Sequence, residues 1–231
     1  GILALSANYY NTFWLNRTRS FFVVDSSGAE SAIYLQGMNA NHSGVEIEAS
    51  IKPMDDLRID IGASFGDWVL LEDLDGEYTD YSSGAAVSTD VNYYVGGLHV
   101  GDAPQNQIMG SITYTGIKGM NARLSMRHYD KFFSDWNVFD RDDAADAGVE
   151  SWQIPSFTLV DLNLNYRLPF DFNGTTVDAF VHVLNLTDAL YIQDAVDNSR
   201  YNDYDGDHDA DDAEVFLGLP RRFNVGMKIN F

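Results

Sequence analysis

The sequence predicts an all-β protein whose fold class is an antiparallel up-and-down transmembrane β-barrel with about eight strands present. Apolar and polar residues alternate over stretches of about nine residues, which is the period of a strand and the length of a tilted strand that crosses a bilayer. Short and long connections between these stretches alternate, as the periplasmic turns and external loops of outer-membrane barrels do. No apolar run approaches the roughly twenty residues of a membrane-spanning helix.

The alternation is clearest in the last stretch, Pro220–Phe231. Its apolar residues fall on one side of an extended strand and its polar residues fall on the other. We interpret this stretch as the closing strand of the barrel, with the apolar side against lipid and the polar side toward the lumen. The apolar side is Phe223, Val225, Met227, Ile229 and Phe231, and the polar side is Asn224, Gly226, Lys228 and Asn230.

Seven further strands with the same alternation precede the closing strand. An even number of strands places both ends of the chain at the periplasmic rim. The predicted strands, in chain order, cover residues 2–14, 44–52, 57–65, 105–114, 121–129, 156–168 and 176–186. The long connections between them are predicted to be loops: the polar stretch after Trp14 up to residue 43, the segment Asp67–Ala103, the connection that contains the acidic DRDDAADAGVES, and the Asp-rich stretch before the closing strand.

Charged residues occupy the polar sides at the centres of these strands, where acidic and basic residues of neighbouring strands can pair across a wet lumen. Aromatic residues gather near strand ends, which favours a girdle at the membrane interface. A soluble barrel could place the same charges outward, so the loop asymmetry and the terminal Phe231 decide for the membrane. The charges are Glu46, Glu48, Arg58, Asp60, Arg123, Arg127, Asp161 and Arg167. The predicted girdle is Trp14, Trp68, Tyr129 and Trp136 at one rim, and Tyr114, Tyr166, Phe170 and Phe231 at the other.

Composition limits the possible partners. The 231 residues suffice for one domain, and the absence of cysteine excludes disulfides and thiolate chemistry. A net charge of −21 repels nucleic acid, so no nucleic-acid partner is expected. The 45% hydrophobic content argues against disorder.

Three stretches together resemble the carboxy-terminal part of TonB-dependent outer-membrane receptors. GVEIEA at residues 44–49 resembles a recurrent strand of that family, and VFLGLPRRFNVGMKINF resembles its last strand with the terminal Phe231. NLTDALY resembles the family's NLFDxxY-like motif, with Thr187 where Phe is usual. The motif residues are Asn185, Leu186, Asp188 and Tyr191.

The resemblance implies a 22-stranded barrel with an amino-terminal plug, located in the outer membrane of a Gram-negative bacterium. Residues 1–231 then form the carboxy-terminal part of the barrel domain, with the plug and the TonB-contacting segment upstream. The implied function is active import of a scarce solute, an iron-siderophore, cobalamin or an oligosaccharide, with energy from an inner-membrane TonB-type complex. Membrane lipid, lipopolysaccharide and the barrel-assembly machinery are the other implied partners, and Phe231 resembles the assembly signal.

The acidic loop DYDGDHDADDAE is the sharpest local signal for a ligand. An EF-hand loop places oxygen ligands at positions 1, 3, 5 and 9 and Glu at position 12. Here His208 stands where the loop's glycine is required, and Gly206 comes two places early. The sequence therefore predicts either a Ca²⁺ site or a solvated acidic loop. The candidate Ca²⁺ ligands are Asp203, Asp205, Asp207, Asp211 and Glu214.

No catalytic motif occurs in the chain. The five histidines lack the spacing of a zinc enzyme, and there is no G-x-S-x-G elbow, phosphate loop or dinucleotide fingerprint. We therefore expect no enzyme and assign no catalytic residue. Two functional classes stay open, the transport receptor and a small complete eight-stranded barrel with a structural or adhesive role.

Overall fold

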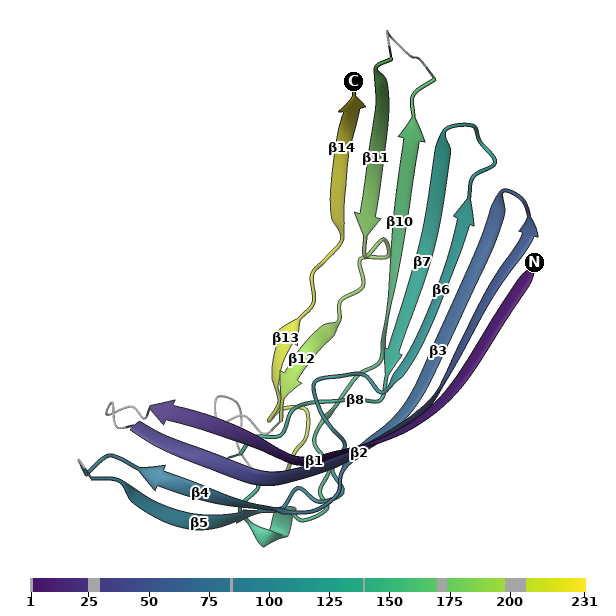
Figure 1. Ribbon diagram of the computed structural model, residues 1–231. Coiled ribbons are helices and arrows are strands. Elements are labelled where there is room, and N and C mark those ends of the chain that lie inside the picture. Colours follow the sequence, from purple (N-terminus) through teal and green to yellow (C-terminus); the bar gives the residue numbers. More distant parts are fainter. Residues whose placement is uncertain (1, 25–29, 84, 139, 170–173, 198–206) are drawn as a thin grey trace.

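The computed structural model describes residues 2–24, 30–83, 85–138, 140–169, 174–197 and 207–231. It confirms the prediction of an all-β, antiparallel protein (Figure 1). The main sheet has ten strands in the order β14-β11-β10-β7-β6-β3-β2-β4-β5, with β1 paired to β2. Its strands are β1 (Leu3–Val24), β2 (Glu30–Met54), β3 (Leu57–Leu70), β4 (Leu74–Asp80), β5 (Val87–Tyr93), β6 (Asn106–Tyr114), β7 (Met120–Asp130), β10 (Phe157–Arg167), β11 (Thr176–Leu184) and β14 (Arg222–Asn230).

Each of the eight predicted stretches lies in a strand of this sheet, and consecutive ones pair as antiparallel neighbours. Both chain ends lie at the edge of the sheet that carries the short connections (Figure 1). Within the described residues the sheet is open, because β1 pairs only with β2 and β14 pairs only with β11. We call the eight-stranded part the wall: residues 1–14, 44–66, 106–129, 157–184 and 222–231.

The register of the wall places apolar residues opposite apolar residues from strand to strand. Val45 pairs with Phe65, Ile112 pairs with Leu124, and Val181 pairs with both Leu164 and Val225. This apolar face does not meet itself in a sealed interior, since Val45 stays 40% and Val225 69% exposed. The face is thus continuous across the wall, and most of its large side chains are exposed, although Val183 near the end of β11 is buried.

The prediction of a loop over residues 15–43 is wrong, because β1 and β2 run on as one long hairpin. The register shifts on both sides of Arg17, and Asn16 and Gly37 have φ angles of 56° and 73°. Such bulges bend a strand without ending it. The two strands curve sharply away from the wall in Figure 1. Bulges interrupt the alternation, and an interrupted alternation resembles a loop in the sequence.

The long connection Asp67–Ala103 is likewise not a simple loop. β3 continues to Leu70, and the hairpin of β4 and β5 pairs with the first half of β2. Two small sheets complete this end of the molecule. They are β8 (Phe132–Phe133) with β9 (Gln153–Ile154), and β12 (Ile192–Val196) with β13 (Glu214–Leu217).

The buried core lies at this end and not in the wall. One cluster is centred on Leu35, Leu74 and Trp136, and a second one contains Phe132, Ile154 and Ala195. We call this end the loop module: residues 15–43, 67–105, 130–156 and 185–221. The loop module is a packed unit, because eleven buried apolar residues form its first cluster.

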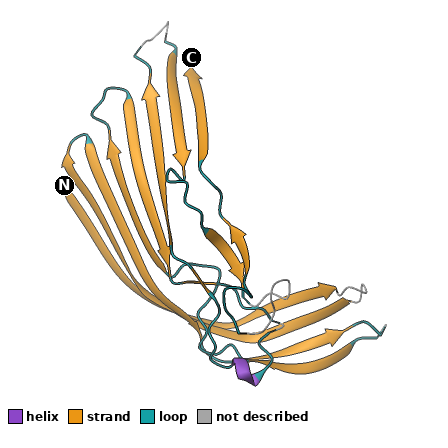
Figure 2. Cartoon of the chain, turned by 180° about the vertical axis from the view of Figure 1, so that it is seen from behind, coloured by secondary structure: helices purple, strands orange, loops and turns teal. Residues whose placement is uncertain are grey.

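Helix is confined to one short turn among the described residues, the 3-10 helix η1 (Ala144–Asp146), drawn purple in Figure 2. None of the described helical segments is long and apolar enough to cross a membrane.

Candidate functional site

The polar face of the wall surrounds a hollow of about 1120 Å³. Strands from β1 to β14 line it with charged and amide side chains. Asp161 accepts a hydrogen bond from Arg127 at 2.5 Å and another from the Asn185 amide at 2.9 Å. Arg58 and Asp60 pair at 2.8 Å. These charges thus pair with one another or with backbone amides along the hollow.

The net charge divides unevenly between the two parts of the chain. Counted over the full sequence, the segments that contain the wall hold eight acidic and eight basic residues, whereas the segments that contain the loop module hold 27 acidic and six basic residues. The whole charge of −21 therefore belongs to the loop module. A field of this sign draws cations to the module and repels anionic solutes.

Four aromatic rings lie together where the polar face reaches the loop module, and we call them the aromatic tier: Tyr10, Trp14, His42 and Trp68. His42 stacks on Trp68 with ring centroids 5.1 Å apart, and Trp14 lies 6.1 Å from His42. The Trp68 indole donates a hydrogen bond of 2.8 Å to the Tyr10 hydroxyl. The Tyr10 ring covers Gly44, where an added Cβ would lie 2.5 Å from the hydroxyl.

The tier corrects the predicted aromatic girdle. The β1–β2 register places Tyr10 and Trp14 on the same face as Asn8 and Glu46, opposite to the apolar face. Trp136 is 4% exposed in the core of the loop module. The sequence indicates the polar face for Trp14, because Trp14 is an even number of residues from Asn8 and side chains alternate between the faces of a strand. Proximity to a strand end was the wrong criterion.

A second aromatic group lies at the end of β7 and the start of β10. Tyr129 and Phe157, which pair in register, have ring centroids 5.1 Å apart. Phe157 in turn stacks on Tyr191 at 4.7 Å. Tyr129 therefore joins an internal stack, whereas Tyr114 and Tyr166 of the predicted girdle do lie on the apolar face. Phe170 lies outside the described residues.

The NLTDALY motif forms the turn that ends β11 and holds the approach to β14. The Asn185 side chain donates to the carbonyls of Ala189 and Leu219 and accepts from the Ala189 amide. Asn185 and Asp188 have φ angles of 51° and 55°, which Asn and Asp tolerate better than most residues. The motif is therefore a structural clamp in this chain.

The rest of the motif completes that clamp. The Asp188 carboxylate accepts the Arg221 amide at 2.8 Å, and the Leu186 carbonyl accepts from the Arg221 guanidinium. The Tyr191 ring covers Gly218 so closely that a Cβ there would collide with it. All four motif residues, Asn185, Leu186, Asp188 and Tyr191, thus contact the segment before β14 or shape the turn facing it.

A buried ionic cluster joins distant segments of the loop module. Arg141 and Asp197 are both 0% exposed and form an ion pair of 2.9 Å. The His208 Nδ1 lies 2.7 Å from the same Asp197 oxygen, and the other oxygen accepts the Trp152 amide at 2.9 Å. Arg141 also donates to the Val149 carbonyl at 2.6 Å. One carboxylate thus fixes three segments that are remote in the sequence.

The charges of this cluster favour the protonated form of His208. Burial lowers the pKa of the imidazole, but the hydrogen bond to Asp197 and its negative charge outweigh burial, so the pKa lies above its ordinary value of 6.5. Arg141 opposes this rise in pKa, and Asp146, whose carboxylate lies 3.6 Å from the other ring nitrogen, adds to it. Below that pKa, Arg141 and the protonated His208 are two cations on either side of one buried anion, Asp197.

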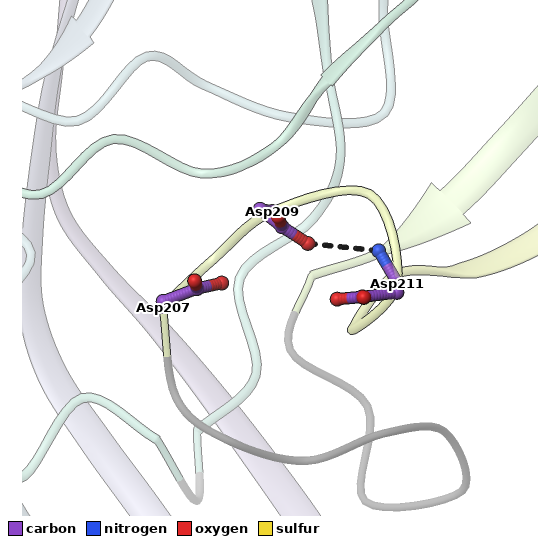
Figure 3. Close-up of side chains that lie close together, drawn as sticks. All are labelled: Asp207, Asp209 and Asp211. Carbon is purple, nitrogen blue, oxygen red and sulfur yellow. Dashed lines mark hydrogen bonds between the residues drawn. The ribbon is translucent and has the colours of Figure 1, made fainter.

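The acidic loop brings together Asp207, Asp209 and Asp211, whose ligand atoms lie within 4.8 Å of one another (Figure 3). The Asp209 side chain accepts the Asp211 amide at 2.9 Å. Among the predicted ligands, Asp207 and Asp211 are in this group, Glu214 begins β13 and is not, and Asp203 and Asp205 lie outside the described residues. Asp209, which the EF-hand spacing omitted, takes part.

Calcium binding by this loop stays a prediction. Three carboxylates at this spacing suit a hard cation with oxygen ligands, and we expect a dissociation constant on the order of 0.1–1 mM, as for extracellular modules. Calorimetric titration of the whole chain with Ca²⁺ measures it. Asp209→Asn should abolish the heat, and Asp90→Asn on β5 is the matched control. A titration without heat would exclude the site.

The scan of family models finds no match for this chain, and the curated proteins contain no match either. The functional argument therefore depends on the faces of the wall, the charge of the loop module and the aromatic tier.

Proposed function

We propose that this chain forms part of a transmembrane β-barrel in the outer membrane of a Gram-negative bacterium, and that the barrel is an active-transport receptor of the TonB-dependent type. The observation that carries the proposal is the division of the wall into two faces. One face is apolar and mostly exposed across eight strands, and the other surrounds a hollow lined by charges. Lipid outside and water inside satisfy both faces at once.

The open edges of the sheet support a larger barrel. An unpaired strand edge cannot face hydrocarbon, because its amides and carbonyls lack partners there. β1 and β14 each offer such an edge. In the receptor, further strands and a plug would complete the barrel. In the alternative, β1 would pair with β14 to close a small eight-stranded barrel with a structural or adhesive role.

The remaining partners follow from the proposed location. Lipid would cover the apolar face, and lipopolysaccharide would surround the rim near the loop module. Phe231, which is fully exposed after β14, would act as the signal for the barrel-assembly machinery. The TonB-type energy complex would act through the segment upstream of this chain, and the loop module would capture the solute.

Cells that produce the full-length protein should contain it in the outer membrane, and deletion of Phe231 should lower the inserted amount several-fold. Membrane fractionation followed by immunoblotting measures both. The aromatic terminus lies beyond the last paired residue, so its loss removes no contact of β14. Deletion of the first residue of the natural chain after its signal peptide is the control. A soluble full-length protein would contradict the proposal.

Energy dependence separates the receptor from the structural alternative. Uptake of bound solute into cells should stop when the inner-membrane proton gradient is dissipated. A barrel that inserts normally but supports no energised uptake would favour the structural role.

A further inference from the structure

The aromatic tier is an exception to the division of the wall into an apolar and a polar face. In the stretches of β1–β3 that belong to the wall, the other large apolar side chains lie on the apolar face, whereas Tyr10, Trp14 and, just beyond the wall, Trp68 lie on the polar one. Trp14 is 51% exposed, so burial does not explain its place there. Exposed aromatic rings on a wet face offer flat apolar surfaces to a solute that also needs hydrogen bonds.

We propose that the aromatic tier binds a neutral oligosaccharide, with one sugar ring against Trp14. The inference rests on the proposed function, since it requires that the polar face lines the passage. The tier lies at the end of the wall nearest the loop module, where the four rings come from three neighbouring strands. A solute that leaves the loop module for the hollow would meet the tier first.

Charge selects the class of solute. The surplus of acidic residues in the loop module repels anions, so acidic sugars and anionic metal chelates are disfavoured before they reach the tier. A cation is disfavoured at the tier itself, because the Arg17 guanidinium lies 5.9 Å from the centre of the Trp14 ring. A neutral ligand meets neither barrier.

A hydrogen-bond donor for sugar hydroxyls lies beside Trp14. The Arg17 guanidinium is 5.9 Å from the centre of the Trp14 ring, and its N–H groups can donate to the hydroxyls of a sugar that covers the ring. A guanidinium beside an aromatic face matches the alternating hydroxyl and C–H surfaces of a pyranose ring.

The three rings beside Trp14 are held in place by contacts with one another and with the backbone. Trp68 is fixed by its hydrogen bond to Tyr10, and His42 is held against Trp68 with an angle of 11° between the rings. Tyr10 lies against the Gly44 backbone. Such preorganisation lowers the cost of ordering side chains on binding.

The test uses the full-length protein and neutral hexasaccharides built on glucose (α- and β-linked), xylose, mannose and galactose, with an acidic hexagalacturonate beside them. We expect at least one neutral sugar to bind by calorimetry and the acidic sugar not to bind. Trp14→Ala should weaken binding about tenfold or more, which corresponds to the loss of one aromatic contact. Phe13→Ala is the matched control, because Phe13 is the neighbouring aromatic residue on the opposite face.

Two results would overturn the inference: no binding of any neutral sugar at millimolar concentration, or equal effects of Trp14→Ala and Phe13→Ala. Either result would leave the transport proposal intact if the protein still inserts in the outer membrane. A protein that fails to insert would refute the transport proposal itself.

Discussion

Replacing Asp197 with Ala should destabilise the loop module by about 3–5 kcal/mol, because it leaves a buried charge without its partner. The Arg141 guanidinium is fully buried and pairs with this carboxylate at 2.9 Å. His208 and the Trp152 amide would lose their acceptors at the same time. Hydrogen exchange of the Leu70 amide, which donates to the Leu98 carbonyl in the core of the loop module, measures the free energy of opening in the full-length protein.

Asp194→Ala is the matched control, because Asp194 is an exposed carboxylate on β12, the strand that ends one residue before Asp197. It should change the free energy of opening by no more than about 0.5 kcal/mol. The pH dependence of the Asp197→Ala effect tests whether His208 is a charged partner of Asp197. Since the folded-state pKa of His208 is raised, its charge stabilises the module fully below about pH 6.5, the unfolded value, and the stabilisation is lost as the pH rises through the folded value. The effect of Asp197→Ala should therefore shrink with rising pH, and an effect independent of pH would contradict the role of His208.

The strands of the wall were predictable because their two faces differ in polarity. A strand with one apolar and one polar face must alternate, and the alternation of Phe223–Phe231 is visible without any partner strand. The register follows, since a slip by one residue would turn every side chain to the wrong face. Antiparallel order and the eight strand positions were therefore accessible from the sequence.

The loop module was not predictable in the same way. Its core depends on contacts such as Arg141 with Asp197, which are 56 residues apart, and no local pattern marks them. The bulges near Asn16 and Gly37 hid the continuation of β1 and β2. The acidic loop was singled out by its composition, but the spacing of a known motif did not identify Asp209 as a neighbour of Asp207 and Asp211.

The family motif illustrates a third case, in which a pattern was noticed and its physical role was not. Asn185 and Asp188 were selected by resemblance alone. The structure gives each a positive φ angle and a backbone partner before β14. The sequence alone does not show which residues these partners are, because Leu219 and Arg221 are more than thirty residues away from Asn185 and Asp188.

Placing a charge on the apolar face should be far more harmful than placing it one residue away on the polar face. Val181 and His182 are neighbours at the centre of β11, and they point to opposite faces. Val181→Arg should cost about 2–4 kcal/mol if this face meets the middle of the bilayer. His182→Arg should cost little, because His182 lines the hollow and lies among polar residues. Unfolding by denaturant in phospholipid vesicles measures both.

The pair tests the orientation of the whole wall, because the two substitutions share the strand, the depth and the new side chain. Differences in strand propensity or in assembly then cancel, and what is left is the solvent on each side. In a soluble sheet the uncovered apolar face would meet water, and an exposed Arg in place of Val181 would be tolerated. Equal costs, or a larger cost for His182→Arg, would therefore mean that the apolar face does not contact lipid. A larger cost for Val181→Arg places hydrocarbon against every residue in register with it, from Leu164 on β10 to Val225 on β14.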